Sequence, residues 1–265
     1  MKDYNTDINI IGSIPDYNLI YKAFELYSKN DFSKIKEAII DKNEFNIRTE
    51  RSRYLFFKVL ETSVLVFKNS NHEILLTNIY KSNVSISTKE VFLFLQIAIN
   101  NILAFDISKN VFLKIYFNNR HLFPKNEIVA YIKNLFNELN YSYLNWSNAT
   151  IEMVASKYLT FLKKINFVEG TNKKQIKPIQ FDNTTFILFI YFIKACYPDN
   201  SNVFENPLID FCFHSKDVFY ERVKKLAMKE YYNMSFTGND LKIETIYNYN
   251  EILNVILNRQ SKEIQ

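Results

Sequence analysis

The stretch SNATIEMVASKYLTFLKKI at residues 147–165, followed by NFVEGTNKKQIKPI at residues 166–179, decides the fold that we expect for this chain. Apolar residues of the first part recur at spacings of three and four, which places them on one face of an α-helix: Ile151, Val154, Ala155, Tyr158, Leu159, Leu162 and Ile165. Ser147 or Asn148 can cap that helix. The second part has two short β-prone pieces around a Gly/Asn turn, and this pattern predicts a hairpin.

The neighbouring elements extend this pattern. A helical pattern over residues 125–139, after Pro124, precedes the stretch, so the order helix, helix, hairpin is that of a winged helix-turn-helix. The chain nearly repeats this order further on, with an apolar helix over 184–197, a helix over 215–229 and β-prone pieces within 231–247. The two hairpins differ in sequence, so the repeat concerns the order of elements only.

Helical spacing dominates the N-terminal part as well. Ser87 and Glu90 form a capping box at the start of one helix. We expect six helical segments in this part, over residues 15–27, 31–39, 49–67, 70–80, 87–105 and 106–116.

We therefore predict a mainly α protein, in which a helical bundle is followed by winged-helix-like units with short β-hairpins. The predicted parts are the bundle at 15–122, a winged-helix-like unit at 123–182, a second helical or winged-like unit at 183–258, and loose tails at 1–14 and 259–265.

The composition supports a packed, helical, soluble protein. Hydrophobic residues make up 48% of the 265 residues, which is ample for a core, and three Gly and five Pro are few for a strand-rich or Gly-loop protein. The most apolar run, 185–197, is shorter than a membrane span and contains Lys194. The polar N-terminus is unlike a signal peptide. We expect a cytoplasmic protein without membrane contact, in which Cys196 and Cys212 are buried reduced thiols.

No catalytic, metal-binding or cofactor-binding pattern emerges from the sequence. His72, His121 and His214 lie on separate segments without a companion three or four residues away, so we expect isolated surface or loop histidines. Neither a phosphate-cradling Gly-x-x-x-x-Gly-Lys run nor a Gly-x-Ser-x-Gly elbow is present. We predict a non-enzymatic protein with no catalytic residue, no metal site and no cofactor.

Local placement of positive charge is more informative than the net charge of +5, which an AT-rich genome would also explain. A polar face on the helix at 147–165 is suited to the major groove of DNA, and a basic hairpin beside it to the flanking phosphates. The candidate residues are Lys157, Thr160, Lys163 and Lys164 on the helix and Lys173, Lys174 and Lys177 on the hairpin. Ordinary solvation of a Lys-rich surface is the alternative, and Glu152 and Glu169 oppose a phosphate contact. Lys216, Arg222, Lys224, Lys225 and Lys229 offer a similar face in the second unit.

An arginine cluster forms a second candidate DNA contact. The chain has six arginines, and three of them, Arg48, Arg51 and Arg53, fall within six residues. Arginine offers planar, bidentate donors that suit phosphates and carboxylates. The alternative is an ion-pair network inside the bundle with Glu50 or Glu61.

Several short stretches resemble the BrxA family, whose members are helical components of BREX bacteriophage-exclusion systems. These stretches are Tyr21–Tyr27, Arg48–Arg53, Ala104–Asp106, Asn148–Thr150 leading to Leu162, and Asn166–Val168. The resemblance extends over residues 15–257 through loose patterns of apolar and basic residues. The chain is longer than the family, chiefly in its C-terminal part, and residues 198–214 match least.

The resemblance implies a NusB-like bundle, binding of double-stranded DNA, and action with other BREX proteins in phage defence. It implies no catalytic residue. Two alternatives stay open: a protein-interaction scaffold of the same system without direct DNA contact, and an RNA-binding NusB-like protein.

Overall fold

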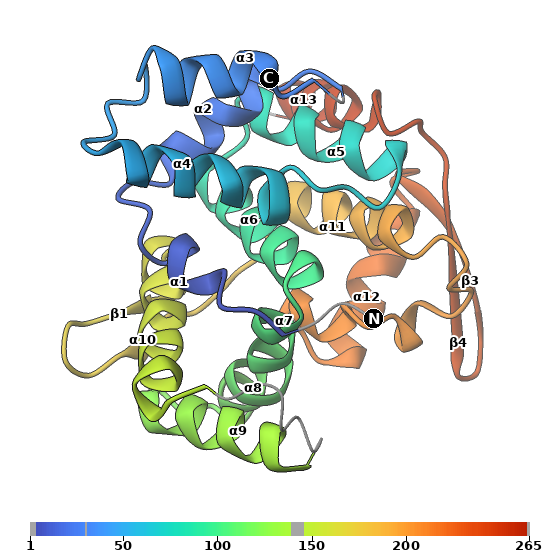
Figure 1. Ribbon diagram of the computed structural model, residues 1–265. Helices are drawn as coiled ribbons and strands as arrows, with labels where there is room; N and C mark the ends of the chain where they lie inside the picture. The colour runs from blue at the N-terminus through green and yellow to red at the C-terminus, as the bar shows by residue number, and fades with distance from the viewer. Residues whose placement is uncertain (1–3, 30, 139–145, 264–265) are drawn as a thin grey trace. The chain divides into compact units, whose positions relative to one another are not determined.

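The structure, a computed structural model, describes residues 4–29, 31–138 and 146–263. It is mainly helical and contains two small antiparallel hairpins, as predicted (Figure 1). The contacts between residues divide the chain into two compact units, and each unit draws on two separate segments. The first unit is Met1–Val66 with Glu90–Ile179, and the second is Phe67–Lys89 with Gln180–Gln265. These units differ from the predicted parts at 15–122, 123–182 and 183–258, because a segment early in the chain joins the C-terminal elements.

The first unit contains most of the predicted bundle together with the first predicted winged-helix-like unit. Short π-helical turns at 37–41, 60–64 and 108–112 extend three of its helices. Its elements are α1 (Ile8–Ile11), α2 (Asn18–Leu26), α3 (Ser33–Lys36), α4 (Glu50–Val59), most of α6 (Ile86–Asn100), α7 (Ile102–Ile107), α8 (Leu113–Phe117), α9 (Lys125–Glu138), α10 (Asn148–Lys164), β1 (Val168–Glu169) and β2 (Gln175–Ile176).

Packed aromatic rings hold α10 and the hairpin against the centre of the first unit. The ring centroid of Phe94 on α6 lies 5.0 Å from that of Phe167 and 6.0 Å from that of Phe112. Phe161 on α10 joins the same cluster, at 6.3 Å from Phe94. Burying a side chain of this kind stabilises a fold by about 1.5–3 kcal/mol. These rings therefore fix the buried face of α10, which is the face predicted from the sequence.

One predicted helix, 87–105, is in fact two. The side chain of Asn101 accepts a hydrogen bond from the Ala104 amide (2.8 Å), so α6 ends and α7 begins at this residue. Asparagine competes with the helical backbone in this way and favours caps. The start of α6 also differs, because Ser85 rather than Ser87 accepts a hydrogen bond from the Thr88 amide (3.1 Å).

Within the described residues, no single helix is both long enough and apolar enough to span a membrane. Two helical stretches, Ile86–Asn100 and Ile102–Phe117, reach that length and composition only as a pair, across a bend of 116°.

The N-terminal segment is packed where a loose tail was expected. Ile8, Ile11 and Ile14 are buried, and α1 lies against α10. Gly12 permits this approach, because a Cβ at its position would lie 2.3 Å from the backbone oxygen of Lys157 on α10. The contact joins residues about 145 positions apart in the sequence, so no local sequence pattern predicts it.

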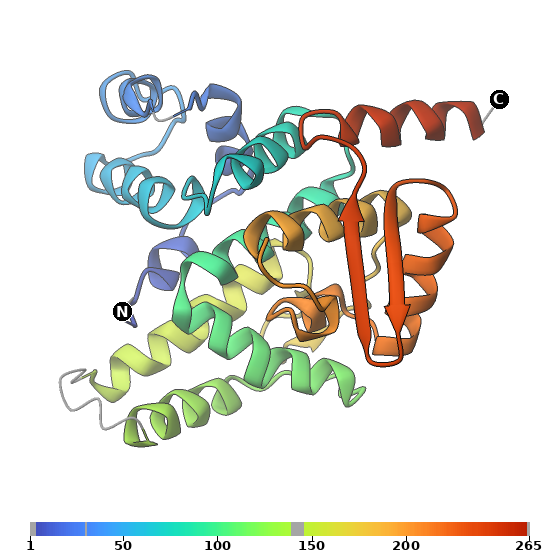
Figure 2. The same ribbon diagram turned by 90° about the vertical axis from the view of Figure 1, so that its right-hand side faces the viewer.

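The second unit is built around a helix that is buried along most of its length, α11 (Asn183–Cys196). The β3–β4 hairpin lies beside α12, as Figure 2 shows. The last helix, which begins at Ile252, continues to Glu263, so most of the segment predicted as a loose tail at 259–265 is helical. The other elements are α5 (Ser70–Lys81), two 3-10 turns at Val203–Glu205 and Ile209–Cys212, α12 (Lys216–Ala227), β3 (Tyr232–Thr237), β4 (Asp240–Thr245) and α13 (Ile252–Glu263).

One of the three histidines departs from the expected surface or loop position, because His72 lies on α5 in the core, whereas His214 lies in the loop before α12. His72 is buried, with its ring 5.0 Å from that of Phe192 on α11. His214 is half-buried; its Nδ1 bonds the carbonyl of Cys212, and its Nε2 lies 2.9 Å from the Arg222 guanidinium. Since arginine can only donate, Nε2 accepts and the proton is on Nδ1. Burial, with Arg222 nearby, lowers the pKa of His214. His121 is exposed, as predicted.

The cysteine prediction is confirmed, because Cys196 and Cys212 are both free and buried. Burial raises the pKa of the Cys212 thiol to about 12, so the thiol is protonated at neutral pH.

Candidate nucleic-acid interface

A short segment before α9 completes the sheet of the first hairpin. The Ile176 amide donates to the His121 carbonyl (2.8 Å), and the Phe123 amide donates to the Lys174 carbonyl (2.9 Å). On its other edge β2 pairs with β1, with Val168 opposite Ile176. β2 therefore lies between β1 and residues 121–123. The sequence does not reveal this segment, since three residues are too few for an alternating pattern.

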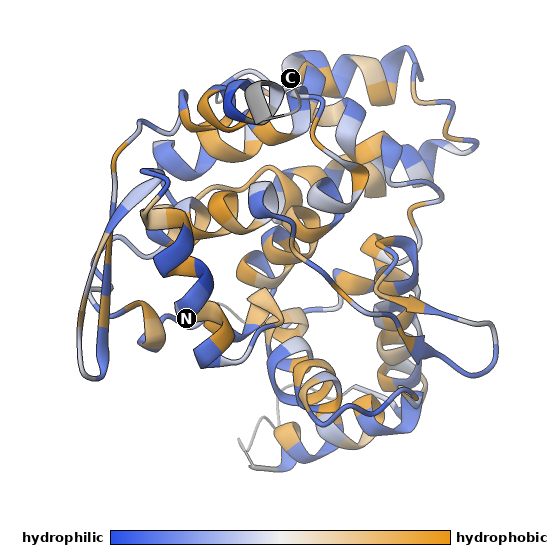
Figure 3. Cartoon of the chain, turned by 180° about the vertical axis from the view of Figure 1, so that it is seen from behind, coloured by the Kyte–Doolittle hydropathy of each residue, from blue (hydrophilic) through white to orange (hydrophobic). Residues whose placement is uncertain are grey.

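The hairpin turn is closed by one of the predicted wing lysines. Lys174 Nζ donates to the carbonyls of Gly170 (2.8 Å) and Thr171 (2.9 Å). Gly170 has a φ of +89°, a conformation that favours glycine. Burial, with the charge of Lys163 nearby, lowers the pKa of Lys174. Hydrophilic residues predominate in this turn (Figure 3).

A cleft of 690 Å³ opens between α10, the start of α9 and the hairpin turn. Three of the predicted contacts, Thr160, Lys173 and Lys174, line it. The full set of lining residues is Leu122, Phe123, Pro124, Lys125, Asn126, Ser156, Leu159, Thr160, Thr171, Asn172, Lys173 and Lys174. All charged residues in this set are lysines.

The start of α9 borders the cleft. The first turn of a helix has N–H groups without intrahelical partners and carries a partial positive charge. Lys125 and Asn126 belong to this turn and line the cleft. Lys125 was not among the predicted contacts, although Pro124 indicates the start of the helix in the sequence. Lys125 also forms an ion pair with Glu152 on α10 (2.5 Å).

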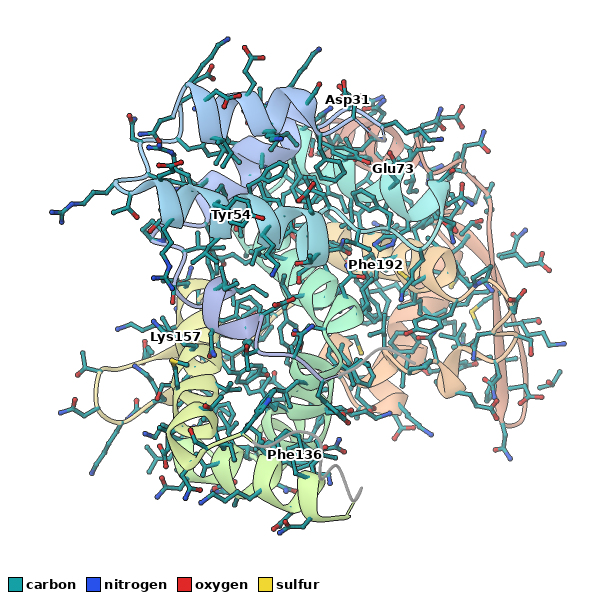
Figure 4. All side chains as sticks on the ribbon, viewed as in Figure 1. Asp31, Tyr54, Glu73, Phe136, Lys157 and Phe192 are labelled. Carbon is teal, nitrogen blue, oxygen red and sulfur yellow. The ribbon has the colours of Figure 1, made fainter. Side chains whose placement is uncertain are left out.

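The predicted polar face of α10 is divided between two surroundings. Ser156 and Thr160 line the cleft, and Lys163 is exposed. Lys157 and Lys164 lie on the side of the helix that meets the N-terminal segment, where both are half-buried. Figure 4 shows Lys157 on α10 beside α1. The face that is free for a ligand is therefore narrower than the sequence predicted.

Lys164 serves the fold of the first unit. Its Nζ donates to the carbonyls of Gly12 (3.2 Å) and Ile14, and it lies over the ring of Tyr17 at 5.4 Å from the centroid. Burial, followed by the nearby charge of Lys157, lowers the pKa of Lys164. A phosphate could reach this ammonium group only if the N-terminal segment moved.

Lys177 lies at the base of the hairpin rather than at its tip. Its amide donates to the Phe167 carbonyl (3.0 Å), and its charge acts on Glu90 of α6. Glu90 also accepts a hydrogen bond from Asn166. Burial nevertheless raises the pKa of Glu90, against these two opposing influences.

The arginine cluster forms a separate surface, since its members do not line the cleft. Arg48 and Arg51 are exposed at the start of α4, and Arg53 is half-buried. Among the described residues, no ion pair joins the three arginines to Glu50 or Glu61, the partners proposed for a network in the bundle. Thr49 caps α4 by accepting from the Ser52 amide (3.1 Å).

The second unit has a cleft of 560 Å³ at its own hairpin. Its lining residues are Asn202, Phe204, Glu205, Lys216, Asp217, Tyr220, Phe236, Gly238, Asn239 and Asp240. Three carboxylates and one lysine line this cleft, in contrast to the lysine-only charge of the first. Arg222, one of the basic residues noted on α12, is stacked on Phe186 at 4.3 Å and is engaged with His214.

Within the described parts of the chain, no group of three or more His, Cys, Asp or Glu side chains is arranged to hold a metal ion. Comparison of the chain with protein-family models, with curated proteins and with solved structures finds no match.

Proposed function

We propose that this protein is a non-enzymatic, cytoplasmic DNA-binding component of a multiprotein bacteriophage-defence system of the BREX type. Its resemblance to the BrxA family supports the system and the NusB-like description of the bundle. The lysine-lined cleft beside α10 is the main observation that supports the proposed DNA contact. The order α9, α10, β1, β2 supports a winged-helix reading of this region.

The cleft suits the sugar-phosphate backbone of a duplex. Lys173 is exposed and supplies positive charge. Lys125, although paired with Glu152, lies at the start of α9, where the partial positive charge of a helix end favours an anion. The exposed stripe of α10, with Met153 and Lys163, would lie toward the adjacent major groove. Contacts to phosphates carry no sequence information, so we expect binding with little preference for sequence.

The test is a salt titration of binding to a 20-base-pair duplex, followed by fluorescence anisotropy. The double variant Lys163→Ala/Lys173→Ala removes two exposed lysines beside the cleft. Each phosphate contact contributes about 0.9 to the slope of log K against log salt concentration, so the slope should fall by about two. The matched control is Lys34→Ala/Lys36→Ala, which removes two exposed lysines of α3 outside the cleft.

Three outcomes decide the matter. Undetectable binding of the wild type at low salt refutes the DNA proposal. An equal fall of the salt slope in the control variant shows that binding depends on diffuse positive charge and not on the cleft. Tighter binding of a single-stranded RNA of equal length favours the RNA alternative.

A protein-interaction role within the same system is the second candidate. The acidic, aromatic-lined cleft of the second unit favours it, because a phosphate backbone is repelled by the carboxylates there.

A further inference from the structure

The second cleft occupies the same position in the order of elements as the first. Each is formed by a short segment, a helix and the hairpin that follows it: 121–123, α10 and β1–β2 in the first unit, and 202–205, α12 and β3–β4 in the second. Asn202 joins its segment to β4, since its Oδ1 accepts from the Leu241 amide (3.1 Å) and its Nδ2 donates to Asp240 (2.9 Å). The two units thus present comparable surfaces with different chemistry.

Aromatic rings form one wall of the second cleft. The centroids of Tyr220 on α12 and Phe236 on β3 are 4.7 Å apart, and Phe204 lies 6.4 Å from Phe236. Phe236 remains 41% exposed. A large exposed ring at the edge of a cleft is typical of an interaction site, since burying it against a partner is favourable.

Carboxylates surround these rings. Glu205, Asp217 and Asp240 line the cleft, and Lys216 is the single lysine among the lining residues. Lys216 lies over the Phe204 ring, with its Nζ 5.8 Å from the centroid. The cleft therefore already holds one cation against an aromatic face, and its three carboxylates exceed that single positive charge by two.

We propose that this cleft binds an arginine-bearing segment of a partner protein. A guanidinium group stacks on aromatic rings and forms bidentate hydrogen bonds with carboxylates, and the cleft offers both kinds of group. Stacking on Tyr220 and Phe236 would leave the guanidinium edge available to Asp217 or Glu205. The first cleft, which has no carboxylate among its lining residues, is unsuited to the same ligand. This proposal does not depend on DNA binding by the first unit.

The test measures anisotropy of a fluorescein-labelled nonapeptide of alternating arginine and leucine with the full chain. The comparison peptide has citrulline at every arginine, which keeps the shape and removes the charge. One stacked cation with two ion pairs should give the arginine peptide at least about tenfold tighter binding. Glu205→Gln/Asp217→Asn should weaken that binding about fivefold.

Glu221→Gln/Glu244→Gln is the matched control, because both residues are exposed in the same unit and neither lines the cleft. It should bind the arginine peptide like the wild type. Phe236→Leu keeps an apolar side chain and removes the ring. It should therefore lower the affinity for the arginine peptide and leave the affinity for the citrulline peptide unchanged. Far-UV circular dichroism verifies that each variant is folded.

Equal affinity for the two peptides overturns the proposal. So does an unchanged affinity in Glu205→Gln/Asp217→Asn, or displacement of the peptide from the cleft by duplex DNA in the Lys163→Ala/Lys173→Ala background.

Discussion

Replacing Gly12 by alanine tests the contact between α1 and α10, which the sequence did not predict. The new Cβ would lie 2.3 Å from the Lys157 carbonyl oxygen and 2.9 Å from the Lys157 carbonyl carbon. An ordinary carbon–oxygen contact is about 3.3 Å, so α1 must withdraw by about 1 Å. The obstacle is the backbone of a long helix, which cannot turn aside as a flexible side chain can.

The sign of the effect is informative. Gly12 has a φ of −66°, a helical value that alanine adopts without strain. Without the clash, the substitution would stabilise the protein by about 0.4–1 kcal/mol, because alanine has less freedom in the unfolded chain. Overpacking of a close contact costs about 1–3 kcal/mol. The clash outweighs this gain, so we expect the free energy of unfolding to fall by up to about 2.5 kcal/mol in Gly12→Ala.

Urea unfolding gives this free energy, and hydrogen exchange of the amides in α1 shows where the change occurs. Protection should fall over 8–14, because withdrawal of α1 exposes Ile8 and Ile11. Ser13→Ala is the control, since Ser13 is exposed beside the contact and its substitution should change stability by less than about 0.5 kcal/mol. A neutral or stabilising Gly12→Ala, with α1 still protected, would refute the close packing.

Three further predictions concern single residues. Lys164→Met keeps the buried stem and removes the ammonium group that donates to two carbonyls. We therefore expect the free energy of unfolding to fall by about 1.5–3 kcal/mol and the N-terminal amides to exchange faster with solvent. Unchanged amide exchange would contradict the contact. Gly170→Ala places a Cβ 2.1 Å from the Lys173 carbonyl oxygen at a positive φ, so the hairpin amides should lose protection while the second unit keeps its own. The pKa of His214 is lowered in the folded state, chiefly by burial, so the unfolded chain binds the proton first as the pH falls below about 6.5. The free energy of unfolding should then decrease from about pH 6.5 down to the folded-state pKa of His214. Urea titrations at a series of pH values measure this decrease, and His214→Gln should remove the part that His214 causes. An identical pH dependence in the variant would show that Arg222 does not hold a neutral imidazole.

Local physics made part of this protein predictable. The apolar stripe of α10, its cap at Ser147 and the hairpin after it depend on neighbours within a few residues, and the structure has all three. The misplaced break at Asn101 shows the limit, because a hydrophobic pattern continues through it while one buried side chain ends the helix.

The candidate interface was predictable only as a set of residue types. From the sequence, we predicted that Lys157, Lys163 and Lys164 share one polar face, because helical spacing does not indicate which other segments pack against the helix. The packing of α1 turns Lys164 into a structural contact and leaves Lys163 exposed.

The sequence alone thus determined most of the helices, the two hairpins and the repeated order of elements, because spacing and turn residues act locally. Tertiary structure decided which parts belong to one unit and which face of α10 stays accessible. It also decided that the two hairpins border clefts of different charge, with Lys173 at the first and Asp217 at the second. These features depend on contacts between residues far apart in the chain, whose loop-closure entropy is offset only when the whole unit packs.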